Sequence, residues 1–314
     1  MIDGAKRRET FVLLICSLII LLSAFFGFAE GRVLIAQKDP THNDSKKDFW
    51  PSLIAQAKTA GLPTRFLLAM DPSFVTLEFD DLHAFAAEYH PENHQLVLNR
   101  SLSFNAAGGT LKPVAQLTPR ELGTLYHELF HAYLDYLSSL ANPETVGPMA
   151  VRLLEFAQDR QQCRYQQVSI TPIVQRKGRT EVRFLTDRES WEALNETWAV
   201  FVGWSIWTKL DMQRGPSQSR RSAAAAQDSW IKRLKKADRD GDLIGYYEPE
   251  SEAERAIARK RYLAPSHRIT PQEVNRLLQD VLEYSKGEAL RIAGVLQQDR
   301  VAFPQSLPCH NFDK

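Results

Sequence analysis

Apolar spacing and helix-start signals predict that most of the chain is helical. The sequence T-P-R-E begins at Thr118 and places a capping hydroxyl three residues before Glu121, with a proline between them. Apolar residues then recur to about Leu140, so we expect a helix over 118–140. The same signal, T-P-Q-E, recurs at Thr270. Further helices are expected at about 49–60, 149–163 and 188–209, and the alanine-rich stretch 217–227 should begin another.

Strand character is confined to short segments. "FVTLEF" (74–79) and "HQLVLN" (94–99) are rich in β-branched and apolar residues, and "HPEN" (90–93) supplies a turn between extended pieces. The segments "VSITPIVQ" and "TEVRFLT" flank Lys177-Gly178 and predict a hairpin. The pattern therefore favours an α+β class, mostly helical, with a small sheet beside the helix at 118–140.

The N-terminus predicts export. Lys6, Arg7 and Arg8 precede a run without charge from Phe11 to Ala29, long enough to cross a bilayer as a helix. The basic flank should stay in the cytoplasm, which places the rest of the chain outside it. We expect a leader over 1–29, either an uncleaved signal-anchor or a cleaved signal peptide, then a linker over 30–48 and a domain over 49–314. The protein would be membrane-anchored or secreted.

Composition adds little beyond ordinary globular character. The chain is 44% hydrophobic and 25% charged with a net charge of +1, which argues against nucleic acid as a partner. A group of basic residues is interpreted as a solvated helix face: Arg220, Arg221, Lys232, Arg233, Lys235 and Lys236.

Two cysteines lie beyond the predicted leader. Cys163 and Cys309 would form one disulfide in an oxidising compartment, whereas Cys16 falls inside the apolar leader. The alternative is a pair of free thiols.

The stretch "LYHELFHAYLDYL" (125–137) carries the chemistry. His127 and His131 are four residues apart, so on a helix they project from one face and can bind one zinc ion together. Glu128 lies beside the first histidine and can move a proton to or from a zinc-bound water. This H-E-x-x-H spacing is a metalloprotease pattern. The structural alternative is that both histidines are core residues, hydrogen-bonded to carbonyls or to Asp135.

"HELFHAYLDY" resembles the active-site helix of thermolysin-like zinc peptidases. In the wider gluzincin group the third ligand is a glutamate on a later helix, in an Asn-Glu-x-x-Ser/Ala setting. "WEALNETWAVF" places Asn195, Glu196 and Ala199 in the matching positions. The resemblance implies a zincin-like fold, a single zinc held by His127, His131 and Glu196, and Glu128 as general base. It covers only these two segments, and Val200 stands where thermolysin-like enzymes have an aspartate.

Other residues of the predicted site are less defined. Glu189 and Glu192 share a helix face with Glu196. We favour Glu196 because its neighbours are more apolar, and burying a carboxylate among apolar residues costs free energy unless the group has a functional role. Asp135 lies one turn beyond His131. Its carboxylate suits a position outside the ligand set, where it would hold an imidazole or a neighbouring helix in place. Gluzincins also use a tyrosine or histidine to stabilise the oxyanion, and the candidates here are Tyr246, Tyr247 and His267.

The segment "AAEYHPENHQLVLNR" (86–100) suggests where a substrate would lie. In zincin folds an edge strand beside the active-site helix commonly binds the substrate backbone. We interpret His90 and His94 in this segment as turn residues.

The expected function is an extracytoplasmic zinc metallopeptidase that hydrolyses peptide bonds through a zinc-bound water. Its partners would be a peptide or protein substrate and, through the N-terminal helix, the membrane. The alternative is a membrane-tethered zincin-fold binding or scaffold protein with a structural or vestigial metal site. Hydrolysis of another kind of amide is a third hypothesis.

Overall fold

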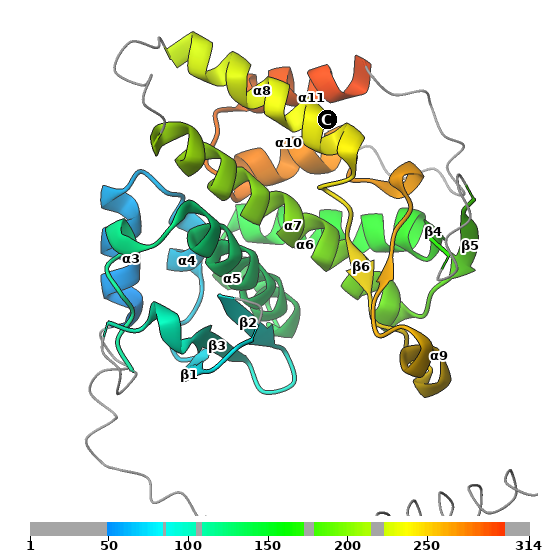
Figure 1. Cartoon of the computed structure of the whole chain (residues 1–314), viewed down its shortest axis with the longest axis horizontal. Coiled ribbons are helices and arrows are strands. Elements are labelled where there is room, and N and C mark those ends of the chain that lie inside the picture. Colours follow the sequence, from blue (N-terminus) through cyan, green and yellow to red (C-terminus); the bar gives the residue numbers. More distant parts are fainter. Residues whose placement is uncertain (1–48, 84–85, 105–108, 173–178, 215–222, 299–314) are drawn as a thin grey trace, which may run out of the picture. The chain divides into compact units, whose positions relative to one another are not determined.

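The computed structural model describes residues 49–83, 86–104, 109–172, 179–214 and 223–298. Within these ranges the protein is α+β, mostly helical with small sheets (Figure 1). The helices are α3 (Phe49–Thr59), α4 (Arg65–Ala69), α5 (Pro119–Ser139), α6 (Pro148–Arg160), α7 (Asp187–Arg214), α8 (Ala223–Asp240), α9 (Glu252–Ile257), α10 (Pro271–Asp280) and α11 (Lys286–Gln298). The strands are β1 (Thr76–Asp80), β2 (Ala87–His90), β3 (Gln95–Asn99), β4 (Gln167–Ile170), β5 (Glu181–Phe184), β6 (Tyr246–Tyr247) and β7 (Arg261–Tyr262).

Both T-P-x-E sequences begin helices, as predicted. In α5 the Glu121 N–H donates to the Thr118 hydroxyl, and the Thr118 N–H donates back to the Glu121 carboxylate. Thr270 and Glu273 make the same reciprocal pair at the start of α10. Each pair satisfies two backbone donors that the first helical turn leaves without partners.

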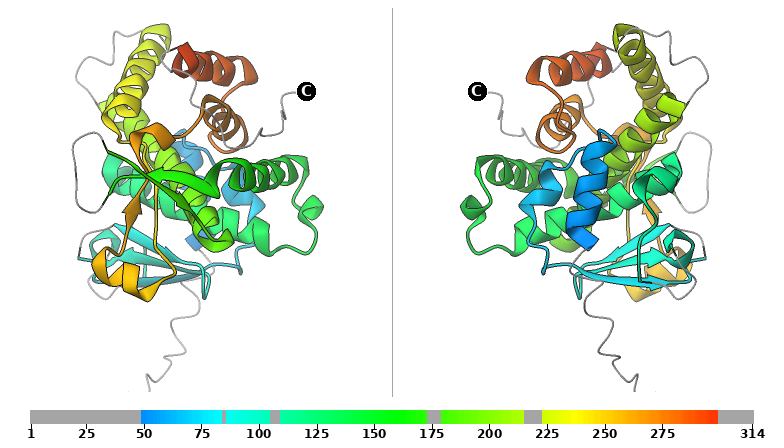
Figure 2. Two further views of the ribbon diagram at one scale, coloured as in Figure 1. Left: turned by 90° about the vertical axis from the view of Figure 1, so that its right-hand side faces the viewer. Right: turned by 90° about the vertical axis from the view of Figure 1, so that its left-hand side faces the viewer.

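The three-stranded sheet packs against α5. β3 lies in the middle, parallel to β1 and antiparallel to β2, so β2 is an edge strand. The β2–β3 turn lies over the predicted "HPEN", although the sequence pattern did not identify β2 itself as a strand. In Figure 2 this sheet lies at one end of the described body, and α10 and α11 lie at the other.

The predicted hairpin is present, and it joins a second strand pair. β4 and β5 are antiparallel, and the connection at 173–178 falls outside the described residues. Ile170 at the end of β4 bridges to Leu263, which follows β7, and β7 pairs with β6. This series of pairings links the hairpin to the strand that carries Tyr246.

Some helix ends differ from the predicted ones. α7 continues to Arg214, where the guanidinium donates to the Leu117 carbonyl, a tertiary contact with no local signature. α6 ends at Arg160, and the helical backbone continues beyond it as a π-helical turn over Gln161–Tyr165.

The predicted leader and linker lie outside the described residues. Among the residues that are described, no helix is both long enough and apolar enough to cross a bilayer.

Two glycines let α5 and α7 touch backbone to backbone. A Cβ added to Gly203 would lie 2.8 Å from the Gly123 carbonyl oxygen and 3.1 Å from the Cβ of His127. A Cβ added to Gly123 would lie 2.9 Å from the Gly203 carbonyl oxygen. Both distances are far shorter than an ordinary van der Waals contact, so no larger residue fits at either position without separating the helices. The two helices therefore cross more closely than usual side chains permit.

Gly203→Ala should weaken the fold. The added methyl group forces α5 and α7 apart, and overpacking of this kind costs about 1–3 kcal/mol of unfolding free energy. Urea unfolding measures the change.

Gly294→Ala provides the matched control. Gly294 lies within α11, and a Cβ there meets nothing within 4 Å. Because alanine favours a helix over glycine by about 1 kcal/mol, this variant should be as stable as the unmutated protein or more so. Equal effects of the two substitutions would refute the close crossing.

Candidate metal centre

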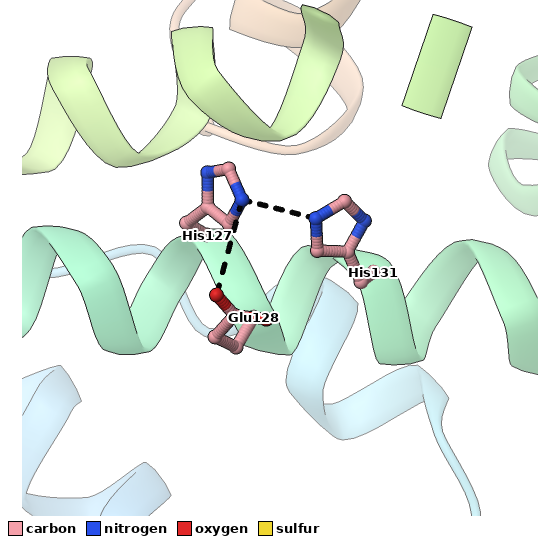
Figure 3. Close-up of side chains that lie close together, drawn as sticks. All are labelled: His127, Glu128 and His131. Carbon is pink, nitrogen blue, oxygen red and sulfur yellow. Dashed lines mark hydrogen bonds and ion pairs between the residues drawn. The ribbon is translucent and has the colours of Figure 1, made fainter. Parts of the chain in front are cut away.

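α5 presents two imidazoles to α7. Gly123, His127 and His131 follow one another at four-residue steps, so they lie along one face of α5, and this face contacts α7. The Nε2 atoms of His127 and His131 are 3.0 Å apart (Figure 3). Both side chains are largely buried, with 18% and 11% of their surface exposed.

Glu196 on α7 faces both imidazoles. It lies two turns before Gly203, so the close crossing brings its carboxylate over the histidines. Its oxygens lie 3.5 Å from His127 Nε2 and 3.4 Å from His131 Nε2. In a tetrahedral zinc site with bonds of about 2.0–2.1 Å, neighbouring ligand atoms are about 3.3 Å apart. The three spacings between these side chains, 3.0, 3.4 and 3.5 Å, are close to that value.

The chemistry of these groups also fits a cation. Oε2 of Glu196 is buried and has no hydrogen-bond partner among the described residues. A buried carboxylate oxygen without a donor is costly, and a bound metal ion would remove that cost. Two imidazole nitrogens 3.0 Å apart repel each other if both present lone pairs, unless a proton or a cation lies between them.

Glu128 is the competing third ligand. His127, Glu128 and His131 can each offer one ligand atom with all three atoms within 4.8 Å of one another. However, Glu128 approaches only His127, at 3.9 Å, and its Oε2 accepts a hydrogen bond of 2.9 Å from the Tyr89 N–H. Because Glu196 is closer and faces both imidazoles, we favour Glu196 as ligand. Glu128 is then left beside the centre.

The pKa values of the four groups shift in different directions. Burial lowers the pKa of His131 to about 4, which keeps that imidazole neutral. Burial also opposes the charging of His127, but contact with Glu196 and the charge of Glu128 outweigh burial and raise the pKa of His127. For Glu196, burial favours the neutral acid, yet the two imidazoles and Tyr246 outweigh it and lower the pKa to about 2. Ionised Glu196 is the form that binds a metal.

Glu128 has the opposite tendency. Burial raises its pKa to about 7, although the charge of His127 and the Tyr89 N–H act against that rise. A carboxyl group whose pKa lies near neutrality can both accept and return a proton at pH 7.

The other two glutamates on this face of α7 have partners of their own. Glu189 accepts the Thr186 N–H at 3.1 Å and the Glu250 N–H at 2.8 Å. Glu192 accepts the Glu248 N–H at 3.1 Å. The residues after β6 therefore run alongside α7, and only Glu196 turns toward the histidines.

Tyr246 is the oxyanion candidate that reaches the centre. Gly245, just before it, lies so close to α7 that an added Cβ would be 2.3 Å from the Thr197 hydroxyl oxygen. This approach brings the Tyr246 phenol to Glu196, and burial together with the Glu196 carboxylate raises the pKa of that phenol. Tyr246 therefore stays protonated and able to donate. Lys260, which sequence reasoning missed, donates to the Tyr246 oxygen at 2.6 Å.

The structure separates the two remaining candidates from the ligands. Tyr247 follows Tyr246 in a strand, so it points to the opposite face, and it is buried near Arg261 and Arg183. His267 packs on the Tyr165 ring with centroids 5.4 Å apart. Neither has a hydrogen bond, ion pair or ring contact with the three ligands among the described residues.

Asp135 holds an imidazole, but one outside the ligand set. Its Oδ2 accepts from the Tyr89 hydroxyl at 2.5 Å and lies 2.8 Å from His94 Nδ1. His94 occupies the β2–β3 turn with a φ of 50°, as expected. Asp135 thereby anchors the β2–β3 hairpin to α5, and the same hairpin carries the N–H that holds Glu128. The turn prediction for His90 was wrong, because His90 is the last residue of β2 and pairs with Gln95.

β2 directs alternate backbone groups away from β3, at its outer edge. The Asn99 N–H donates to the Ala86 carbonyl at 2.9 Å, and the register pairs Ala87 with Leu98 and Tyr89 with Leu96. Because antiparallel pairing alternates, the peptide groups of Ala87 and Tyr89 face away from β3. The Tyr89 N–H reaches Glu128 for this reason.

Cys163 is disulfide-bonded. The other two cysteines of the chain, Cys16 and Cys309, both lie outside the described residues. Pairing with Cys309 stays a prediction.

The carboxyl group of Glu192 should make stability depend on pH in a direction that can be tested. Burial raises its pKa from 4.5 to about 7. Between these values the folded protein holds a proton that the unfolded chain has released, so Glu192 lowers stability as pH rises. Glu192→Gln removes this penalty. In metal-free protein, its gain in unfolding free energy should grow by about 1–3 kcal/mol between about pH 5 and pH 8.

Urea unfolding at the two pH values measures that gain. The same substitution at the exposed Glu155 on α6 controls for general effects of removing a charge. A gain for Glu192→Gln that is the same at both pH values would contradict the raised pKa.

Comparison of the chain with protein-family models, with curated proteins and with solved structures found no match. The resemblance to gluzincins stays a prediction from the sequence.

Proposed function

We propose that this protein is a zinc-dependent metallopeptidase with a gluzincin-like ligand set on a zincin-like fold. One observation carries the proposal. Two imidazole Nε2 atoms lie 3.0 Å apart beneath a carboxylate whose buried Oε2 accepts no hydrogen bond, and a second carboxylate stands beside them without entering the set. Three ligands plus a separate acid–base group is the composition of a catalytic zinc site.

His127, His131 and Glu196 would hold the ion. When bound there, zinc supplies a Lewis acid and lowers the pKa of a water in the fourth position to about 7. Two neutral imidazoles and one ionised carboxylate leave a net charge of +1 around the ion, which favours deprotonation of a neighbouring water.

Glu128 would move the proton. Its carboxylate takes a proton from the attacking water and returns it to the leaving amine, so it acts first as base and then as acid. The Tyr89 N–H holds one of its oxygens, which leaves the other, Oε1, on the side of His127. This fixed orientation explains why Glu128 is placed for proton transfer.

Tyr246 would stabilise the oxyanion. A protonated phenol beside the ligands can donate to the carbonyl oxygen as it gains negative charge, which lowers the barrier more than it strengthens substrate binding. Among the three candidates, Tyr246 alone has the contact with Glu196 that this role needs.

The substrate backbone would add to β2. This strand is an edge of the sheet, it packs against α5, and the Ala87 N–H and the Ala87 and Tyr89 carbonyls face outward, while the Tyr89 N–H is held by Glu128. A peptide paired there would run past Glu128. The location we propose is outside the cytoplasm, by way of the leader at 1–29.

The metal ligands can be tested by zinc content. The purified protein should contain one zinc per chain. His127→Ala, His131→Ala and Glu196→Ala should each lose the metal, because each removes one of three ligands. Glu128→Gln should keep it. Atomic absorption gives the stoichiometry.

Glu192→Ala is the matched control for Glu196→Ala, one helical turn away on the same face. It should keep zinc. If Glu196→Ala kept zinc and Glu192→Ala lost it, the third ligand would be misassigned. An unmutated protein without metal would remove the enzyme proposal altogether.

The base and the oxyanion donor can be tested by turnover of a peptide library. Glu128→Gln should lower kcat at least about 100-fold because general acid–base catalysis contributes that much or more. Tyr246→Phe should lower kcat by about 100-fold, the usual cost of one oxyanion donor. Tyr247→Phe is its control and should stay near the unmutated rate. A larger loss for Tyr247→Phe than for Tyr246→Phe would reverse the assignment.

A further inference from the structure

Lys260 is the one ammonium group among the described residues that is bonded to the proposed oxyanion donor. It lies just before β7, and its Nζ donates to the Tyr246 oxygen at 2.6 Å. The same Nζ lies 3.9 Å from the centroid of the Tyr246 ring. Tyr262 of β7 pairs with Tyr246 across the two strands, and their ring centroids are 5.7 Å apart. The Tyr246 side chain is thus fixed by contacts with β7 and with the residue that precedes it.

The direction of the Lys260 hydrogen bond decides where the phenol proton can go. An ammonium group has donors and no acceptor, so the Tyr246 oxygen must accept from it. The single phenol hydrogen is then free for a second partner. That partner lies on the side of Glu196, whose carboxylate interacts with the same phenol.

We propose that Lys260 is a positioning residue for Tyr246: it occupies the acceptor side of the phenol oxygen and directs the O–H toward the oxyanion. This inference rests on the proposed peptidase function. A hydrogen bond from a charged donor is stronger than a neutral one, and it polarises the next bond in the chain. The phenol O–H becomes a better donor, and this gain is greatest when full negative charge develops on the substrate oxygen.

The neighbouring cation has a different partner. Arg259 donates to Glu248 at 3.0 Å and is more exposed than Lys260. Of these two adjacent basic residues, Arg259 therefore lies at the surface and Lys260 contacts the centre. Lys260 also lies close enough to the ligands for its charge to oppose protonation of His131. A cation so close to the three proposed ligands disfavours the binding of a second cation, so Lys260 does not help to hold zinc.

The test uses the full chain loaded with zinc and compares Lys260→Met, Lys260→Arg and Tyr246→Phe. Lys260→Met should lower kcat about tenfold with KM changed less than about twofold, since it weakens a donor that acts mainly in the transition state. Lys260→Arg should restore most of the rate. Adding Lys260→Met to Tyr246→Phe should cause no further loss, because the lysine acts through the phenol.

A second readout does not depend on turnover. The dissociation constant of acetohydroxamate, an oxyanion-bearing zinc ligand, is measured by calorimetry. Lys260→Met and Tyr246→Phe should each weaken binding by about fivefold, and the double variant should be no weaker than Tyr246→Phe. Zinc content should stay at one per chain in every variant. Arg259→Met, which removes the adjacent charge, is the control and should bind acetohydroxamate normally.

Several results would overturn the assignment. An unchanged kcat and unchanged hydroxamate binding in Lys260→Met would do so, as would a fully additive loss in the double variant. A rise in KM confined to peptides with a free C-terminal carboxylate would make Lys260 a substrate anchor instead.

If Lys260→Met does not fold, Lys260→Gln, which keeps a neutral donor, should show the same pattern with a smaller loss. A protein that binds zinc and hydroxamate but cleaves no peptide refutes the proposed function, while the hydroxamate series still decides the role of Lys260.

Discussion

The contact between Gly123 and Gly203 is the constraint on which the rest of the centre depends. Helices usually stand apart by the depth of their side chains, but here the backbones of α5 and α7 meet, with His127 against Gly203. Two turns along α7 from this point, Glu196 is brought within 3.5 Å of both imidazoles. A helix pair separated by ordinary side chains would leave that carboxylate out of reach. Gly245 likewise lets the chain before β6 approach the backbone of α7 closely, and this approach places Tyr246 beside Glu196.

The buried charged groups of this arrangement lower the stability of the fold. Glu128 and Glu196 are both largely buried beside two imidazoles, and unpaired buried carboxylates destabilise a fold. A divalent cation between the ligands would offset this cost, so metal binding and stability should be coupled. The surrounding hydrogen bonds each hold a different group in place. The Tyr89 N–H holds Glu128, Asp135 anchors the hairpin that carries Tyr89, and Lys260 holds Tyr246.

Part of this could be predicted from local signals. The capping sequences located the starts of α5 and α10, because a cap is a contact between residues three apart in sequence. The spacing of His127 and His131 predicted a shared face for the same reason. The choice of Glu196 over Glu189 and Glu192 rested on apolar neighbours and on a family resemblance. In the structure the other two glutamates accept backbone N–H groups from the segment after β6.

The sequence by itself determined the positions of the longer helices, including α5 and α7, and which of their faces carry imidazoles and carboxylates, since helix periodicity and capping depend on near neighbours. The helices α4, α9 and α11 were not individually predicted. The tertiary structure alone decided the contacts between distant segments. It turned Tyr246 rather than Tyr247 toward Glu196, sent Asp135 to His94, and brought Lys260 to the phenol. These outcomes depend on strand register and on how closely two backbones approach. No local pattern specifies either of them, because both follow from packing between segments that lie far apart in the chain.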